Sequence, residues 1–352
     1  MDIEKFVDDV TIAVNSKVNQ AISQKNFAYQ KLLEESSKIF KRRWDAALEI
    51  CGFRSLSSNE EMAYDVAVAS CLITQAVFML DDVIDKTDKR EGRTAIWAKY
   101  GANETVIATH TLVNLFMEEL IHIGLGKDIL SSALGLLDTL LRGEHKDIVK
   151  NKRDLLTKDE YWKLCSEKAG AITKTYASLA AKAARADPER EKTISRCGEL
   201  IGILAQVTDD LLDLEEDISE GKTSLPLILL EELGGDVTDR LWEDLKERGI
   251  LEYIRQKINL LAQEGIDLTS KLERNEHTEM LRNVFVLWDK FYSAILERGD
   301  AGAALKAIGA DGIERSFELM FIRTKPDMGR YEVNKIIDEE MSKRLKIGSY
   351  VA

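Results

Sequence analysis

Two clusters of aspartates are the residues in this sequence whose type and spacing are best suited to chemistry. Each cluster has the pattern Asp-Asp-x-x-Asp, and its members are Asp81, Asp82 and Asp85 in the first and Asp209, Asp210 and Asp213 in the second. On a helix, residues i and i+4 lie on one face one turn apart, so the outer aspartates of a cluster point the same way. Carboxylates so close together repel one another, and a helix C-terminus also disfavours negative charge. The spacing therefore predicts that bound cations neutralise both clusters.

The chemistry of the ligands indicates which cation is expected. Carboxylate oxygens are preferred by Mg²⁺, which commonly binds through one or two carboxylates, waters and substrate phosphates. Histidines and cysteines do not cluster beside these aspartates, so a zinc set is not indicated. One such cluster in an acidic protein is typical of a solvated helix face, whereas two copies, each after an apolar run, favour a metal site. We expect a magnesium centre that binds a phosphate-bearing substrate.

The elements that must position the clusters are helices. Residues 62–80 and 200–214 are nearly all apolar or small, which predicts a buried helix leading into each cluster. Only three prolines occur in 352 residues, and no segment alternates with a period of two, so we expect no substantial sheet. Further helices are expected at 104–124, 127–150, 158–186, 190–198 and 329–346, with breaks at Gly92, Gly101, Gly143, Asp187-Pro188 and Gly221. We predict one all-α domain over residues 1–352.

Composition excludes several classes of protein. The net charge of −13 argues against a nucleic-acid surface, which requires basic patches. No basic start precedes an apolar run, and no apolar stretch reaches the roughly 18 residues that span a bilayer. The four cysteines form no CxxC pair, which predicts free thiols in a reducing compartment. We expect a cytoplasmic protein that is not an integral membrane protein.

Four short segments, in order, resemble the motifs of one enzyme family. Residues 81–92 are similar to the first aspartate-rich motif of the trans-isoprenyl diphosphate synthases, the polyprenyl synthetase family, and residues 206–213 are similar to the second. Residues 167–170, Glu-Lys-Ala-Gly, resemble the helix that carries a diphosphate-binding lysine, and residues 221–226 resemble the segment after the second motif. The ordered resemblance spans about residues 34–230, whereas residues 235–352 show no comparable match.

The resemblance implies a class I isoprenoid synthase fold, a single helical bundle around a central cavity, and a homodimer. Both aspartate clusters would share three Mg²⁺ ions that hold the diphosphate of an allylic prenyl substrate while the C–O bond breaks. Direct metal ligands would be Asp81, Asp85 and Asp209, with Asp82, Asp210 and Asp213 nearby or indirect. The diphosphate oxygens would contact Arg90, Lys168 and Lys222, and Gln206 would lie close to the allylic carbons.

The residues four and five positions before the first aspartate help to set chain length in this family. Here they are Val77 and Ala76, which are small and would leave the pocket open one helical turn below the aspartates. We therefore expect a prenyl chain of about fifteen to twenty carbons, on the resemblance alone.

The site for the usual acceptor, isopentenyl diphosphate, departs from the family pattern. Residues 36–41 replace a Gly-Gly-Lys-Arg-x-Arg segment, so that Lys38 keeps one charge and Lys41 stands for an arginine, without the bidentate fork of a guanidinium. Glu91 occupies the place of a second arginine, and Trp97 that of a histidine. A carboxylate beside a diphosphate is repulsive. These changes predict an atypical member of the family.

Three hypotheses follow from these departures. In the first, which we favour from the sequence, the carbocation cyclises as in a terpene synthase or alkylates another acceptor, with Trp97 lining the pocket and stabilising positive charge. In the second, the protein is an ordinary chain-elongating synthase whose acceptor diphosphate is held by the basic cluster at 38–43. In the third, it is a non-catalytic subunit that regulates an active partner. The intact aspartates argue against this third hypothesis.

Overall fold

The computed structural model describes residues 3–298 except 39, 41, 91–92, 125, 151–155 and 213; the helix expected at 329–346 lies outside the described residues. The elements are α1 (Ile3–Ser23), α2 (Gln30–Ser36), α3 (Trp44–Arg54), α4 (Glu60–Asp85), β1 (Lys89–Arg90), β2 (Arg93–Thr94), α5 (Ile96–Tyr100), α6 (Ala102–Ile123), α7 (Lys127–Lys150), α8 (Lys158–Cys165), the π-helix η2 (Ser166–Gly170), α9 (Ala171–Ala183), α10 (Pro188–Leu212), α11 (Leu214–Glu220), α12 (Leu225–Glu232), α13 (Leu241–Glu247), α14 (Ile250–Thr269) and α15 (Glu276–Arg298).

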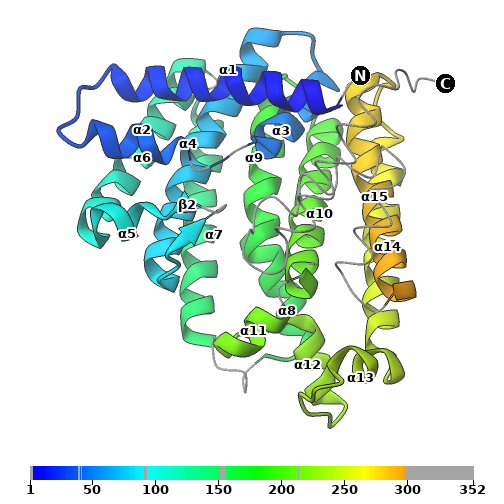
Figure 1. Cartoon of the computed structure of the whole chain (residues 1–352). Helices are drawn as coiled ribbons and strands as arrows, with labels where there is room; N and C mark the ends of the chain where they lie inside the picture. Colours follow the sequence, from blue (N-terminus) through cyan, green and yellow to red (C-terminus); the bar gives the residue numbers. More distant parts are fainter. Residues whose placement is uncertain are drawn as a thin grey trace, which may run out of the picture.

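The long helices lie side by side in a bundle, and α9 contacts both α4 and α10 (Figure 1). Helices α4 and α10 run in the same direction, and α9 runs in the opposite one. The π-helix η2 directly precedes α9 in the chain. The two aspartate clusters, at the C-terminal ends of α4 and α10, therefore lie at the same end of the bundle as η2. The prediction of an all-α chain is confirmed, because in the described residues the only strands are β1 and β2, which pair as a two-residue antiparallel hairpin.

Helix α4 is the buried helix that the apolar run predicts. Its residues 66–76 are all buried among the surrounding helices, and Asn59 caps its start by accepting a hydrogen bond from the Met62 N–H at 3.2 Å. The expectation that no apolar stretch is long enough to cross a membrane was wrong, since α4 satisfies that test by length and composition. However, 67% of its most apolar window is buried inside the protein, which is the behaviour of a core helix.

Glycines bring η2 into close contact with two other helices. A Cβ on Gly202 of α10 would lie 2.3 Å from the Ala169 carbonyl oxygen, and one on Gly143 of α7 would lie 3.3 Å from the Glu167 carbonyl oxygen. The predicted break at Gly143 was wrong, because this glycine lies inside α7, where its missing side chain admits the backbone of η2. The separate helices expected at 190–198 and 200–214 are likewise one continuous helix, α10. The π-helix is thus fixed between α7 and α10.

Candidate active site

The first aspartate cluster forms the last turn of α4. Helix α4 ends at Asp85 because the next residue, Lys86, adopts a left-handed backbone conformation with φ of 56°. The N–H groups of Lys86 and Thr87 both donate to the Asp82 carbonyl oxygen, which closes the helix. A left-handed conformation is costly for a residue with a side chain. This strained residue directs the chain sharply into the β1–β2 hairpin, which carries Arg90.

Arg90, which lies on that hairpin, contacts the first aspartate cluster and neutralises part of its charge. Its guanidinium donates to Asp82 Oδ1 at 2.8 Å and to Asp81 Oδ2 at 2.9 Å, and it lies 4.5 Å from the centre of the Phe78 ring. The structure therefore brings this predicted diphosphate ligand to the first cluster. Its contact with a diphosphate remains a prediction.

Lys168 approaches the same cluster from η2. Its Nζ lies 3.9 Å from Asp81 Oδ1 and 3.6 Å from Glu144 Oε2 of α7. Single-turn π-helices inside α-helices are frequent at functional sites, since the additional residue shifts the direction of a side chain. Two predicted cations and one predicted metal ligand thus meet at one point, although they are far apart in the sequence. Glu144, which the sequence marks only by its place beside Gly143, belongs to this group.

Asp82 differs from its two neighbours because it points into the protein. Its side chain is only 1% exposed, and this burial raises the pKa of its carboxyl to about 6, against the opposing effect of Arg90. One of its oxygens, Oδ2, is buried with no hydrogen-bond partner among the described residues. A buried oxygen without a donor is costly, and a hard cation nearby would relieve that cost.

In the second cluster, on α10, one aspartate is again partly exposed and the next one is buried. Asp209 is partly exposed, whereas Asp210 is buried and accepts hydrogen bonds from the Leu225 N–H at 2.9 Å and from Gln206 Nε2 at 3.1 Å. Burial raises the pKa of Asp210 to about 6. Since Leu225 is the first residue of α12, Asp210 holds the start of that helix, which fits its predicted indirect role. Asp213 lies outside the described residues.

Two aromatic residues that the sequence did not single out support α10 beside the second cluster. The Trp288 Nε1–H donates to Thr208 Oγ1 at 3.1 Å, and Tyr292 lies against the same hydroxyl. Both aromatic residues are on α15 and are fully buried. They fix the turn of α10 that precedes Asp209. No motif could have identified them, because their role depends only on the packing of α15 against α10.

The fit of these residues to Mg²⁺ can be judged from their donor chemistry. Among the described residues, no three acidic, histidine or cysteine side chains converge on one point, and Arg90 and Lys168 are paired with the first cluster. The donors at both helix ends are nevertheless carboxylate oxygens, and one of them is buried without a partner. This set suits a hard divalent cation. Which residues bind it directly remains a prediction.

The other residues predicted to bind the allylic substrate lie on α4, on α10 and between α11 and α12. Gln206 bonds to Asp210, and Lys222 lies between α11 and α12 with its N–H donating to the Asp217 carbonyl oxygen at 2.8 Å. Val77 is partly buried and packs against the core, whereas Ala76 is buried inside it. Of the two small residues expected to open the pocket, only Val77 lies at an accessible surface.

The region expected to bind the acceptor diphosphate contains an arginine that the sequence analysis missed. Arg93 on β2 is exposed, and its guanidinium donates to the Lys38 carbonyl oxygen. Trp97, predicted to line the pocket, donates its indole N–H to the Thr87 carbonyl oxygen at 2.8 Å, which anchors the turn after the first cluster. Lys41 and Glu91 lie outside the described residues.

The two arginines of the basic cluster at 38–43 have structural roles. Arg43 is fully buried, lies 4.4 Å from the centre of the Phe40 ring and donates to Asn15. Arg42 pairs with Asp8 at 2.9 Å. The basic cluster at 38–43 therefore contributes fewer available charges than its composition suggests.

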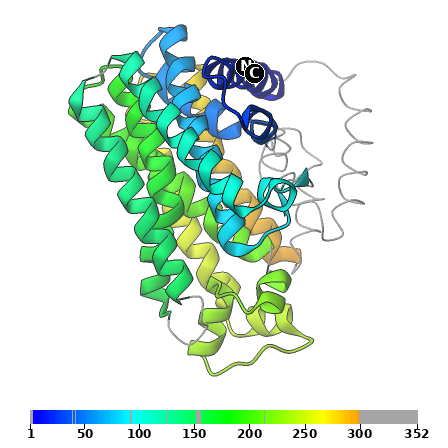
Figure 2. The same cartoon turned by 90° about the vertical axis from the view of Figure 1, so that its left-hand side faces the viewer.

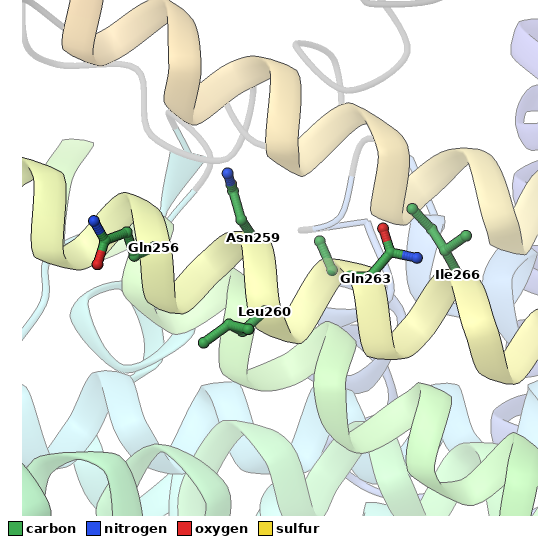
Figure 3. A pocket seen from close by; sticks show the side chains of 6 residues that line it. Gln256, Asn259, Leu260, Gln263 and Ile266 are labelled. Carbon is green, nitrogen blue, oxygen red and sulfur yellow. The ribbon is translucent and has the colours of Figure 1, made fainter.

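A separate cavity of about 500 Å³ lies along α14, and no aspartate of either cluster lines it (Figure 3). Amide and aliphatic side chains line it, namely Gln256, Asn259, Leu260, Ala262, Gln263 and Ile266. None of these groups can act as an acid, a base or a nucleophile at neutral pH. The candidate active site is therefore the region where α4, α7 and η2 meet.

Known proteins resemble this chain over much of its length. The polyprenyl synthetase family model matches residues 29–249. Geranylgeranyl diphosphate synthase of Methanosarcina mazei is 26% identical over 254 residues, which covers 64% of this chain and 78% of that protein. Octaprenyl diphosphate synthase of Escherichia coli is 23% identical over 245 residues, covering 65% and 75%.

Solved structures show the same fold. The geranylgeranyl pyrophosphate synthetase of Geoglobus acetivorans superposes with a TM-score of 0.71 at 20% identity, covering 81% of this chain and 99% of that one. A polyprenyl synthase of Caulobacter crescentus, solved with calcium and isoprenyl diphosphate, has a TM-score of 0.70 at 19% identity, covering 80% and 95%.

The fold and the paired aspartate clusters define an all-α enzyme of isoprenoid biosynthesis. This chain belongs to the polyprenyl synthetase family. It is an isoprenyl diphosphate synthase, a prenyltransferase.

The buried carboxyl of Asp82 predicts a pH dependence of stability. Its pKa in the fold, about 6, lies above its ordinary value of 3.8. The folded state therefore binds the proton more tightly, and the free energy of unfolding of the metal-free protein falls as the pH rises from about 4 to 6. The slope from one such group reaches at most about 1.4 kcal/mol per pH unit. Asp82→Asn should remove this contribution, leaving that of Asp210, when urea unfolding is measured at pH 4, 5, 6 and 7 with a chelator.

The matched control is Asp88→Asn, which changes an exposed aspartate three residues beyond the cluster. This variant should keep the wild-type pH dependence. An Asp82→Asn variant with an unchanged slope would show that Asp82 is ionised in the fold at low pH.

Proposed function

We propose that this protein is a chain-elongating synthase that joins an allylic prenyl diphosphate to isopentenyl diphosphate and yields a product of about fifteen to twenty carbons, assisted by Mg²⁺ at the two aspartate clusters. The observation that carries the proposal is the meeting of Asp81, Arg90 and Lys168 at one end of α4. The family relatives named above are elongating synthases by name, which supports this hypothesis over the cyclising one that the sequence alone favoured.

The residues of the chain have distinct roles in the proposed reaction. Asp81, Asp85 and Asp209 would hold up to three Mg²⁺ ions, which supply Lewis-acid stabilisation of the charge that develops on pyrophosphate. Arg90 and Lys168 would exchange their carboxylate partners for diphosphate oxygens. The allylic C–O bond breaks and pyrophosphate leaves with the electron pair. The double bond of the acceptor then attacks C1, and loss of a proton restores a double bond.

The acceptor diphosphate needs positive charge that Glu91 cannot supply. Arg93 lies two positions beyond Glu91, and its guanidinium contacts the backbone of Lys38. We propose that Arg93 and Lys38 together bind the acceptor diphosphate. An arginine here restores the planar fork that recognises phosphate, so the substitution at position 91 does not by itself remove the acceptor site.

The reaction assay tests the central proposal. Purified protein is incubated with Mg²⁺ and geranyl, farnesyl or geranylgeranyl diphosphate, with and without isopentenyl diphosphate. We expect longer prenyl diphosphates only when isopentenyl diphosphate is present, and a loss of turnover of at least a hundredfold in Asp81→Ala or Asp209→Ala, because one carboxylate ligand is removed. Circular dichroism checks that both variants fold. Release of a hydrocarbon or alcohol without isopentenyl diphosphate would instead establish the cyclising hypothesis.

The role of Arg93 predicts a change confined to one substrate. Arg93→Gln should raise the KM for isopentenyl diphosphate about tenfold, which is the effect of losing one charge-assisted hydrogen bond, and leave the KM for the allylic substrate within twofold. Arg42→Gln, which removes a neighbouring arginine paired with Asp8, is the matched control. Equal effects of the Arg93 change on both substrates would argue against a role in acceptor binding.

We also propose that two copies of the chain pair through α7. Its outer face carries Leu134, Leu141 and Ile148, spaced seven residues apart and 56%, 60% and 52% exposed. Figure 2 shows α7 along the face of the bundle that is turned to the viewer. An apolar stripe with this period is typical of a helix that packs against another helix, and its exposure in one chain is unfavourable.

The dimer is tested by changing the middle of the stripe. Leu141→Glu should convert a dimer into a monomer in analytical ultracentrifugation, since it would bury a charge in an apolar interface. Leu260→Glu, at a leucine of α14 that is 66% exposed, should leave the sedimentation unchanged. A wild-type protein that sediments as a monomer would refute the proposal.

A further inference from the structure

Helix α4 is connected to the consecutive elements η2 and α9 by two side-chain bridges, one ionic and one between hydroxyl groups. At the active-site end, Lys168 lies 3.9 Å from Asp81. Deeper in the bundle, Thr74 Oγ1 donates to the Tyr176 hydroxyl oxygen at 2.7 Å. Thr74 precedes Asp81 by seven residues, which is roughly 10 Å along a helix and returns to the same face. Both bridges therefore lie on one face of α4.

The π-helix explains how the partner residues on the other side reach the same line. Lys168 and Tyr176 are eight residues apart, and in a regular α-helix this spacing turns the two side chains about 80° away from each other. Lys168 lies within η2, whose hydrogen bonds span one residue more than those of an α-helix. The wider turn absorbs the extra residue, so that an eight-residue spacing here matches the seven-residue spacing on α4. The two bridges can then form together.

Side chains at the second bridge are less exposed than two apolar side chains nearer the ionic bridge. Val77 on α4 and Ile172 on α9, which lie between the bridges in the sequence of each helix, are partly exposed. Thr74 and Tyr176 are each only 5% exposed. Along these residues, exposure therefore decreases from the ionic bridge towards the Tyr176 ring.

Beyond the second bridge the interior is polar. Ser70 Oγ, one turn further along α4, donates to Glu49 Oε1 at 2.7 Å, and the other Glu49 oxygen is buried without a hydrogen-bond partner among the described residues. An apolar chain that passed the Tyr176 ring would meet these groups and would separate them from their partners, which is unfavourable. The Tyr176 ring and the polar groups behind it therefore both oppose a longer apolar chain at this position.

We propose that Tyr176, braced by Thr74, is the floor of the prenyl pocket and limits the length of the prenyl chain that the site accepts. The inference rests on the proposed function, since it takes the diphosphate to bind at Asp81 and Lys168. It adds a specificity-determining residue on α9 that lies outside all the sequence motifs. The chain would run from the ionic bridge, past Val77 and Ile172, towards the Tyr176 ring.

The test measures binding and so does not require turnover. Geranyl, farnesyl, geranylgeranyl and geranylfarnesyl thiolodiphosphates, which resist ionisation, are titrated with Mg²⁺ into wild-type protein by calorimetry. Affinity should increase with each isoprene unit until the chain reaches Tyr176, and we expect no further gain beyond twenty carbons. In Tyr176→Ala the gain should continue for one more unit, so that the geranylfarnesyl compound binds at least tenfold more tightly than to wild type, because a buried isoprene unit removes several carbons from water.

Two further variants separate the floor from a general loss of packing. Tyr176→Phe keeps the ring and removes the hydroxyl, and it should keep the wild-type length limit. Tyr176→Leu leaves a smaller cavity than alanine and should also extend the limit, which covers the case in which the alanine variant fails to fold. A length limit that is unchanged in both the leucine and the alanine variants, or in the leucine variant alone if alanine does not fold, would overturn the proposal.

The results also separate this inference from the proposed function. Wild-type protein that binds the compounds with a length limit but does not elongate substrates with isopentenyl diphosphate would refute elongation and leave the floor standing. Elongation with a limit that Tyr176→Leu and Tyr176→Ala do not move would refute the floor alone. Failure of wild-type protein to bind any of the compounds with Mg²⁺ would refute both.

Discussion

The mutual repulsion of carboxylates at the ends of two buried helices is the constraint on which the rest of this structure depends. Asp81 and Asp82 lie at the C-terminal end of α4, where the helix dipole adds to their repulsion. Two cations from other elements offset this repulsion, namely Arg90 of the hairpin and Lys168 of η2. The turn at Lys86 and the π-helix exist at these positions because each presents one of these cations to the carboxylates.

This arrangement has a consequence for the chemistry. Arg90 and Lys168, which would bind a diphosphate, are both paired with Asp81, which would bind a metal. A substrate that brings both metal and diphosphate can exchange all these partners at once and leave no charge unpaired, whereas a metal or a diphosphate alone would leave one side uncompensated. The inward-facing aspartates Asp82 and Asp210 have a different role, since they tie the two clusters to Arg90 and to the start of α12.

The packing of η2 shows how precisely the bundle must position the site. Glycines at 143 and 202 let α7 and α10 approach the backbone of η2 more closely than a side chain would allow. Without that contact the extra residue of the π-helix would have no fixed place, and Lys168 and Tyr176 would not face α4 together. The same element thus places a charge beside the diphosphate site and a ring at the proposed end of the prenyl chain.

The sequence by itself determined the fold class, the helices that end in aspartates, the family and the cations expected near the diphosphate. These are readable because helical periodicity and short motifs are local properties of the chain. It could not show that Arg93 contacts Lys38 or that Trp97 bonds to Thr87, because these contacts form only when the segment after α4 folds back onto the chain.

Only the tertiary structure decided which aspartates face inward, which glycine breaks a helix and which admits another backbone, and which small residue of α4 is buried in the core. Gly143 and Ala76 illustrate the reason. A glycine can end a helix or admit a neighbouring one, and a small apolar residue can line a pocket or fill a core. The sequence is the same in both cases, and what differs is the element that packs against it, which is set by residues distant in the chain. The spacing of the aspartates predicted a metal site from the sequence. The residues that surround each aspartate in space determined whether it is exposed or buried, and with which group it pairs.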